Sequence, residues 1–342
     1  MLENLYNSAP ARKITRKDRI VIFSDTHMGD GGKKDDFVHN GDFFLDLLKH
    51  YYSRDFVLIL NGDIEELHKF SLPRILSRRQ GIYDMFDKFC RRRSMVRIVG
   101  NHDYNLYREK EFRLRFPIVE AAKLDFSGNI LFIFHGHQAG FIPKFMQPIS
   151  AFVVRYISYP LGLKNYSVAY NSKKRYRLEE KVYAFAGKKN ILAVIGHTHR
   201  PLFESLSTID SIKFRIEKNC RAYPAAAPAQ QQELEEKIRK DKQELRKLID
   251  GKETGSGPLY SRDTLVPCVF NSGCCIDRNG LNAIEICDGN IELVYWFDKR
   301  RTEKYFNFGD HTPEQLGNSD YWRVTLKKEP LDYVFTRVRL LS

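Results

Sequence analysis

The sequence lacks a membrane-spanning run, an exported leader and a cysteine framework. Its longest weakly charged stretch, 141–163, is interrupted by Lys144, Arg155 and three prolines, whereas a spanning helix needs about 20 apolar residues. The first residues, 1–13, hold no apolar run of the kind that a secretory leader carries. Six cysteines occur without a CxxC pair, which is not the pattern of a disulfide scaffold or a structural zinc site. We expect reduced thiols in a cytoplasmic protein.

The composition is that of a folded protein with an excess of positive charge. Hydrophobic residues make up 42% of the 342 residues and charged residues 29%, so wholesale disorder is excluded. The length allows two domains or one large domain with insertions; we expect one domain over 1–342, with insertions at 138–189 and 224–258. The formal net charge of +13 favours phosphate-bearing partners and does not choose among nucleic acid, nucleotides and anionic lipid.

Short apolar runs that end in polar, metal-competent residues recur along the chain. The segments are RIVIFSDTH (19–27), FVLILNGD (56–63), MVRIVGNHD (95–103), NILFIFHGH (129–137) and NILAVIGHTH (190–199). Apolar residues at helical intervals separate the first three, around 43–48 and 82–89. This alternation predicts an α/β fold with largely parallel, buried strands, whose polar ends meet at one edge of the sheet.

The remaining segments predict insertions and a further set of strands. Residues 138–189 pass from an apolar to a basic stretch, and we expect them to cap the site, with Lys173, Lys174, Arg175 and Arg177 binding substrate. The apolar part, 141–163, is interpreted either as a helix packed on the domain or as a lid that accepts an acyl chain or contacts a membrane surface. Residues 231–249 predict a charged helix within the second insertion. The C-terminal part predicts short strands in a second sheet or extending the first.

The residue types at the strand ends suit a pair of divalent metal ions. Six of the ten histidines lie there, together with aspartates and an asparagine. Carboxylate, imidazole and amide oxygen are ligands for Mn²⁺, Fe²⁺ and Zn²⁺. Two ions about 3.5–4 Å apart need a bridging carboxylate, and such a pair activates a shared water and clamps phosphate oxygens. An unligated histidine could protonate the leaving group, with a neighbouring carboxylate keeping it charged.

The ordered motifs resemble those of the calcineurin-like metallophosphoesterase superfamily. They are Asp25-Thr-His27, Gly62-Asp63, Gly100-Asn101-His102-Asp103, His135-Gly-His137 and Gly196-His197-Thr-His199. The resemblance implies a two-sheet β-sandwich flanked by helices in four layers. It further implies a hydrolase that uses a hydroxide bridging two divalent ions, with manganese as the first expectation and iron or zinc as alternatives.

Carried onto this chain, the resemblance assigns a role to each motif residue. One metal would be held by Asp25, His27, Asp63 and His199. The other would be held by Asp63, Asn101, His135 and His197, so Asp63 is the bridge. His102 would be the general acid, with Asp103 behind it. His135 is favoured over His137 as a ligand because it directly follows the strand.

A narrower resemblance is to the enzymes that cleave the pyrophosphate of UDP-2,3-diacylglucosamine. It rests on the segments SDTHMGDGGKKDDF, GDIEEL and GHTHRP and on the insertion at 138–189. The chain departs from that branch at Glu65, Glu66 and His68, where aromatic residues are expected, and at His102, where the branch carries arginine. The implied substrate is a phosphorylated small molecule or an amphiphilic, lipid-like pyrophosphate, with peripheral membrane contact as a further expectation.

Other functions fit the same motifs. A nucleotide phosphodiesterase or nuclease would use the basic charge, but the sequence shows no stacked-aromatic nucleic-acid motif. A protein phosphatase would use the same metals. A non-catalytic binding scaffold is the alternative of another class. We expect loss of a ligand or of the acid histidine in a scaffold, and every such position is filled here.

Overall fold

The computed structural model describes residues 1–140, 172–203, 222–250, 266–307 and 312–342, with single positions between 204 and 221. Its strands form two sheets. The five-stranded sheet has the order β1 (Ala11–Ile14), β6 (Ala121–Phe126), β7 (Asn129–Phe134), β8 (Leu192–Ile195) and β9 (Val269–Asn271). The eight-stranded sheet has the order β12 (Glu314–Gln315), β13 (Tyr321–Pro330), β11 (Asn290–Asp298), β10 (Gly280–Cys287), β2 (Ile20–Phe23), β3 (Val57–Asn61), β4 (Met95–Ile98) and β5 (Ile118–Val119).

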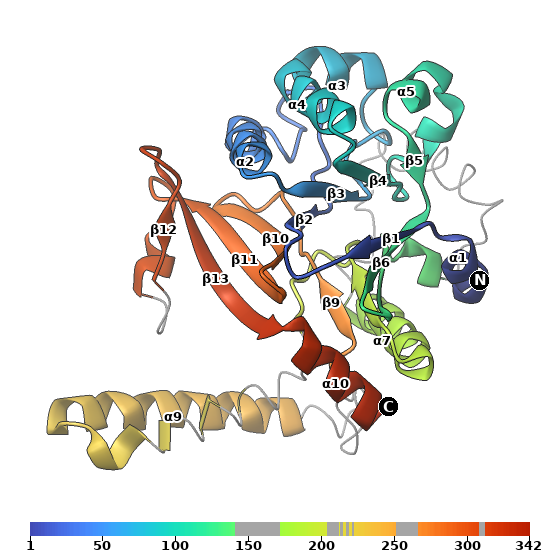
Figure 1. Cartoon of the computed structure of the whole chain (residues 1–342). Coiled ribbons are helices and arrows are strands. Elements are labelled where there is room, and N and C mark those ends of the chain that lie inside the picture. The colour runs from blue at the N-terminus through green and yellow to red at the C-terminus, as the bar shows by residue number, and fades with distance from the viewer. Residues whose placement is uncertain are drawn as a thin grey trace.

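Helices cover the outer faces of both sheets (Figure 1). The helices beside the eight-stranded sheet are α2 (Gly41–Ser53), α3 (Leu72–Arg78), α4 (Gln80–Arg91) and α5 (Lys110–Arg115). Those beside the five-stranded sheet are α1 (Leu2–Ser8) and α7 (Ser172–Lys189), and α10 (Leu331–Leu341) closes one end of the sandwich. The predicted α/β sandwich of two sheets flanked by helices is confirmed.

The predicted parallel β-α-β-α-β unit is present at the centre of the eight-stranded sheet. β2 pairs with β3, and β3 with β4, all in parallel. Successive side chains of β2 point to opposite faces of the sheet, one toward the helices and the other toward the second sheet. Val21 and Phe23 pack against α2 and α4, whereas Ile20 and Ile22 face the other sheet. Because all three strands run the same way, their carboxyl ends lie at one edge.

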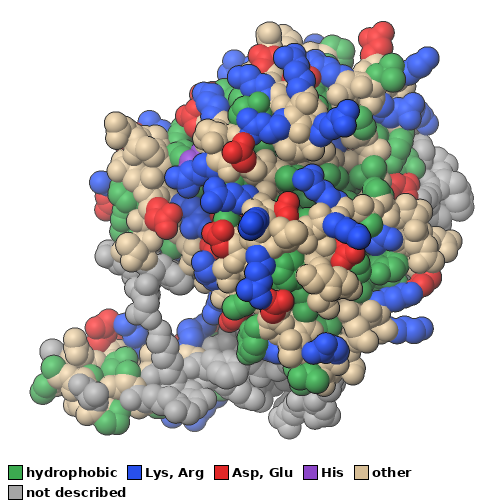
Figure 2. Space-filling view, viewed as in Figure 1, with side chains coloured by type: hydrophobic (Ala, Val, Ile, Leu, Met, Phe, Trp, Pro, Cys, Tyr) green, Lys and Arg blue, Asp and Glu red, His purple; other side chains and the backbone are tan. Residues whose placement is uncertain are grey.

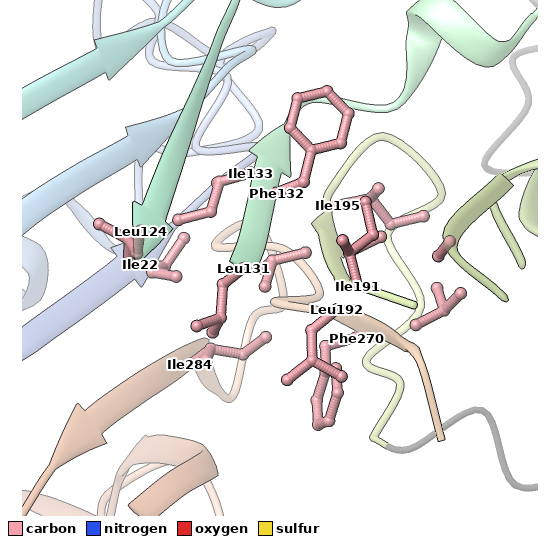
Figure 3. Close-up of a cluster of buried hydrophobic side chains, with 14 of the residues drawn as sticks. Ile22, Leu124, Leu131, Phe132, Ile133, Ile191, Leu192, Ile195, Phe270 and Ile284 are labelled. Atoms are coloured by element: carbon pink, nitrogen blue, oxygen red, sulfur yellow. The ribbon is translucent and has the colours of Figure 1, made fainter. Parts of the chain in front are cut away.

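The core between the sheets joins strands from distant parts of the chain. Figure 3 shows Ile22 and Ile284 of the eight-stranded sheet lying toward Leu124 and Leu131 of the five-stranded sheet. All four side chains are buried. At about 25 cal/mol per Å² of apolar surface, such burial is the main term that holds the two sheets together.

The C-terminal strands extend both sheets. β9 joins β8 in parallel, and β10 pairs antiparallel with β2. β10 and β11 form a hairpin whose turn contains Asp288 and Gly289, both at positive φ. Short C-terminal strands were predicted, whereas β6, β12, β13 and α10 were not.

The second half of the predicted cap forms a helix that packs on the five-stranded sheet. Residues 141–171, which include the whole apolar stretch 141–163, lie outside the described residues. Residues 172–189 form α7, which buries Leu178, Val182 and Ala186 in the core against the five-stranded sheet. This helix is therefore part of the domain, and it cannot be removed without exposing the sheet.

The charged helix of the second predicted insertion is present and longer than expected. α9 (Pro228–Asp250) carries the ion pairs Glu233–Lys237 and Glu236–Lys240 at i,i+4 spacing. It lies away from both sheets in Figure 1. Among the described helices, none is long and apolar enough to span a bilayer.

Phe132→Ala tests the account of the core. Phe132 is fully buried, and its ring contacts those of Tyr6 and Phe134 at centroid distances of 5.3 and 4.7 Å. We expect the free energy of unfolding in urea to fall by about 3–5 kcal/mol because a large cavity is created. The control Leu340→Ala, at a side chain that is 72% exposed, should change it by less than about 0.5 kcal/mol. Equal losses in the two variants would contradict the assignment.

Candidate metal centre

The loops after β2 and β3 continue the parallel pairing of the strands beyond the sheet. Asp25 N donates to Gly62 O at 3.0 Å, and His27 N donates to Asp63 O at 2.9 Å. The loops after β7 and β8 are joined in the same way, since Gly196 N donates to His135 O at 2.9 Å. Backbone hydrogen bonds therefore bring the motif residues of four strands to one place.

The predicted ligands occupy strained backbone. Ten non-glycine residues have positive φ among those that the structure describes, and five of the ten are Asp25, His27, Asp63, His197 and His199. A left-handed conformation costs a residue with a Cβ about 1–2 kcal/mol. Strain of this kind persists only where the surroundings impose it, and it gathers at functional sites.

The motif glycines let the carboxylates approach the neighbouring loops. A Cβ on Gly100 would lie 2.1 Å from Asp63 Oδ1, and one on Gly196 would lie 2.6 Å from Asp25 Oδ2. The space is used by hydrogen bonds, because His102 N donates to Asp63 Oδ1 at 2.8 Å and His197 N donates to Asp25 Oδ2 at 3.0 Å. Each carboxylate thus has one oxygen fixed by backbone and the other directed at the histidines.

Six of the predicted ligands form two neighbouring clusters. One consists of Asp25, His27 and His199, and the other of Asp63, His135 and His197. His199 Nε2 lies 3.1 Å from Asp25 Oδ1, and His135 Nε2 lies 3.1 Å from Asp63 Oδ2. His135 Nε2 is also 3.9 Å from Asp25 Oδ1, so the two clusters lie next to each other.

Unpartnered buried atoms show that the donor set fits metal ions. Among the described residues, Asp25 Oδ1, Asn101 Oδ1 and His135 Nε2 are buried without an aligned hydrogen bond. His135 Nδ1 donates to Asn61 O at 2.8 Å, so in the neutral ring Nε2 is the nitrogen that carries the lone pair. His27 Nδ1 donates to Glu66 Oε2 at 3.2 Å, with the same result. Buried polar atoms normally have partners, and a divalent cation would supply one.

The electrostatics of the metal-free cluster agree with this fit. Burial opposes ionisation of Asp63, yet His135 and His102 lower the pKa of that carboxyl well below its usual range. Burial likewise opposes protonation of His135, but Asp63 and Asp25 raise the pKa of this histidine to about 9. Burial and the charge of His135 lower the pKa of His197 to about 3. In the metal-free protein, protonated histidines therefore compensate the charge of the carboxylates. Bound metal ions would take over this role.

Glu66, and not Asp103, is the carboxylate that holds His102. His102 Nδ1 donates to Glu66 Oε1 at 2.9 Å, and Nε2 lies 4.0 Å from Asp63 Oδ2. Asp103 instead accepts hydrogen bonds from Gly100 N at 2.6 Å and Ile64 N at 2.8 Å. The expected position of Asp103 behind His102 is therefore corrected: its role is to fix the motif loops.

The pKa values of Glu66 and Asp103 also indicate that Glu66 is the charged partner of His102. Burial opposes ionisation of Glu66, but His102 and His27 lower its pKa. Burial, Asp63 and Glu65 raise the pKa of Asp103 to about 7. Glu66 is thus the fixed negative charge beside His102, and the pKa of that histidine is raised by Glu66 and Asp63 despite its burial.

A second layer of buried residues fixes the loop that carries His197 and His199. Asn271 Nδ2 donates to Gly196 O at 3.0 Å and to Thr198 Oγ1 at 2.8 Å. Thr198 Oγ1 in turn donates to Glu179 Oε1 of α7 at 2.9 Å. Sequence reasoning missed Asn271 and Glu179, because neither lies in a motif and only the fold brings them to the loop.

The other predicted site residues come from the loop after β7 and from α7. His137 lies beside the cluster, with ring centroids 5.5 Å from His135 and 6.3 Å from His197. Lys173 and Lys174 fall in α7, but their side chains lie outside the described residues. Arg175 is half-buried and Arg177 is exposed on the same helix. Substrate binding by these four residues stays a prediction.

A family model for the calcineurin-like phosphoesterase superfamily domain matches residues 19–214. The matched range contains every predicted metal ligand and covers more than half of the chain. Among curated proteins, none matches this chain.

Glu66→Gln tests the source of the charge on His102. Removing the carboxylate should lower the pKa of His102 in the metal-free protein, because Asp63 alone then opposes the effect of burial. A histidine NMR titration measures the midpoint. Asp103→Asn is the matched variant and should move that midpoint less. The reverse order would restore Asp103 as the partner of His102.

Proposed function

The chain belongs to the calcineurin-like phosphoesterase superfamily, and we propose that it is a hydrolase of phosphoesters or pyrophosphates that uses two divalent ions. The observation that carries the proposal is the pair of adjoining His/Asp clusters, whose ligand atoms lie within 4.8 Å of one another in each. The buried, unpartnered oxygen and nitrogen atoms at their centre give the ions ready-made ligands.

The proposed metal ligands follow the two clusters. Asp25, His27 and His199 would hold one ion and His135, His197 and Asn101 the other, with Asp63 between them. Support for the bridging role comes from Asp63 Oδ2, which lies 3.1 Å from His135 Nε2 and 3.9 Å from His27 Nε2, one histidine of each cluster. Imidazole, carboxylate and amide ligands suit Mn²⁺, Fe²⁺ and Zn²⁺, and we propose Mn²⁺ first on the resemblance of the motifs.

When bound, the two ions would supply Lewis acidity for phosphate oxygens and for the attacking water. The chain itself supplies the proton for the leaving group. His102 presents Nε2 to the cluster, and its other nitrogen is held by Glu66. Glu66 also holds His27 through its second oxygen. One carboxylate thus orients the proposed general acid and a proposed ligand together.

For the substrate, we propose a phosphate-bearing compound with a pyrophosphate or an amphiphilic leaving group. The narrower resemblance of the motifs supports this, as does the positive charge of α7 at Arg175 and Arg177. The apolar part of the predicted cap, which would receive a lipid chain, lies outside the described residues.

A hydrolysis screen with added Mn²⁺ tests the proposal. It should compare p-nitrophenyl phosphate, bis-p-nitrophenyl phosphate, nucleotide diphosphate sugars with and without acyl chains, a phosphopeptide and single-stranded DNA. Metal-dependent turnover of any phosphate ester supports a hydrolase. Preference for the acylated nucleotide sugar supports the narrower substrate. Absence of turnover with every substrate and metal would favour the non-catalytic scaffold.

Asp63→Ala should abolish hydrolysis and strongly weaken binding of both ions, because one carboxylate would serve the two sites. Elemental analysis after gel filtration measures the metal content. Asp332→Ala, at an exposed carboxylate that pairs with Arg16, is the control and should keep full occupancy. Two ions retained per chain in Asp63→Ala would refute the bridge.

His102→Ala should keep the metals and slow turnover by about 10²–10⁴-fold, the usual contribution of a general acid. The loss should shrink for p-nitrophenyl esters, whose leaving group needs no proton, and be greatest for alkyl esters. Single-turnover rates across a series of leaving groups measure the difference. An equal loss for both kinds of ester would exclude the acid role.

A further inference from the structure

A cationic hollow lies at the edge of the sheet opposite the candidate metal centre. It has a volume of about 450 Å³ and is lined by six cationic side chains: Arg12, Lys17, Arg19, Arg54, Arg92 and Arg93. They come from β1, from the loop into β2, and from the turns that precede β3 and β4. Figure 2 shows Lys and Arg side chains gathered over β1 and the loop into β2, the elements at the front of Figure 1.

Strand direction separates this hollow from the metal centre. Its residues precede the amino ends of β2, β3 and β4, whereas Asp25, Asp63 and Asn101 follow the carboxyl ends. At about 3.3 Å per residue, strands of this length place the two sites on the order of 13 Å apart or more. A ligand in the hollow therefore does not contact the metal ligands.

The two carboxylates of the hollow are already engaged. Asp18 Oδ2 accepts hydrogen bonds from Thr15 N at 2.7 Å and Thr15 Oγ1 at 2.9 Å. Asp55 pairs with Arg92 at 2.8 Å. In the part of the chain that the structure describes, no carboxylate pairs with Arg12, Lys17, Arg54 or Arg93. The hollow thus keeps an uncompensated positive charge.

Helix ends explain only part of this charge. Arg54 and Arg92 are the C-cap residues of α2 and α4, where cations complement the helix dipole. Arg93 directly follows the C-cap of α4, and its φ is 55°. The position after a helix C-cap favours glycine, and a residue with a Cβ is strained at this φ. The chain therefore has an arginine where glycine would relieve backbone strain.

We propose that the hollow binds a small polyphosphate anion, independently of the metal centre. Its volume falls in the range of roughly 300–1,000 Å³ that holds small ligands. Five of its six cations are arginines, whose planar guanidinium groups bind phosphate oxygens in pairs. Its concave shape favours a compact ligand, such as the phosphate chain of a nucleotide, over a flat membrane or a duplex.

The experiment is calorimetric titration of the whole protein with inorganic tripolyphosphate at fixed ionic strength. Arg93→Gly removes the side chain and relieves the strained φ. We expect it to weaken binding by about tenfold or more, the value of one charge-assisted contact, while its melting temperature stays equal or rises. Lys110→Gln is the control: it removes the same charge from an exposed position outside the hollow and should retain the affinity of the wild type.

Two further arms locate the site and identify the ligand. Asp63→Asn, which disables the proposed metal bridge, should bind tripolyphosphate as the wild type does. Loss of binding in that variant would show that tripolyphosphate binds at the metal centre. Equal losses of affinity in Arg93→Gly and Lys110→Gln would show that the binding is only general charge attraction. Either result overturns the proposal. A third result would also overturn the proposal: a single-stranded oligonucleotide or anionic lipid vesicles bind more tightly than tripolyphosphate or ATP, and this binding depends on Arg93. The ligand would then be a macromolecular surface.

Discussion

The burial of two carboxylates at the ends of adjacent parallel strands is the constraint on which the site depends. Asp25 and Asp63 have almost no exposed surface, and an isolated buried charge is too costly to persist without compensation. One oxygen of each accepts a backbone N–H, and histidines approach the other. Glycines at 100 and 196 make room for this arrangement. The positive φ of five ligands follows from it, because the loops must turn sharply to direct their side chains inward.

Much of the fold and the site could be predicted because their signals are local. Buried parallel strands appear as continuous apolar runs, and the metal-competent residues stand directly after them. β6 and β13 were missed because their residues alternate or are mostly half-exposed, as in YWRVTLKKEP, so neither has an apolar run. The core role of α7 was missed because its polar composition conceals the narrow stripe of Leu178, Val182 and Ala186.

The partner of His102 shows where sequence reasoning stops. Asp103 is adjacent to this histidine in the chain, and adjacency made it the natural candidate. In the fold, the backbone N–H groups of Gly100 and Ile64 occupy Asp103, and Glu66 arrives from the loop after β3. Asn271 and Glu179 are likewise far in sequence from the loop with His197 and His199 that they hold in place. Such contacts depend on which loops meet in three dimensions, which no spacing along the chain reveals.

The two edges of the central strands have opposite character. The carboxyl edge gathers aspartate, asparagine and histidine, and the amino edge gathers arginine. At the carboxyl edge, we propose that the clusters hold two ions bridged by Asp63. Anomalous diffraction at the manganese edge from crystals grown with Mn²⁺ tests it most directly. The account predicts two peaks about 3.5–4 Å apart on either side of the Asp63 carboxylate. A single peak, or two peaks that Asp63 does not join, would contradict it.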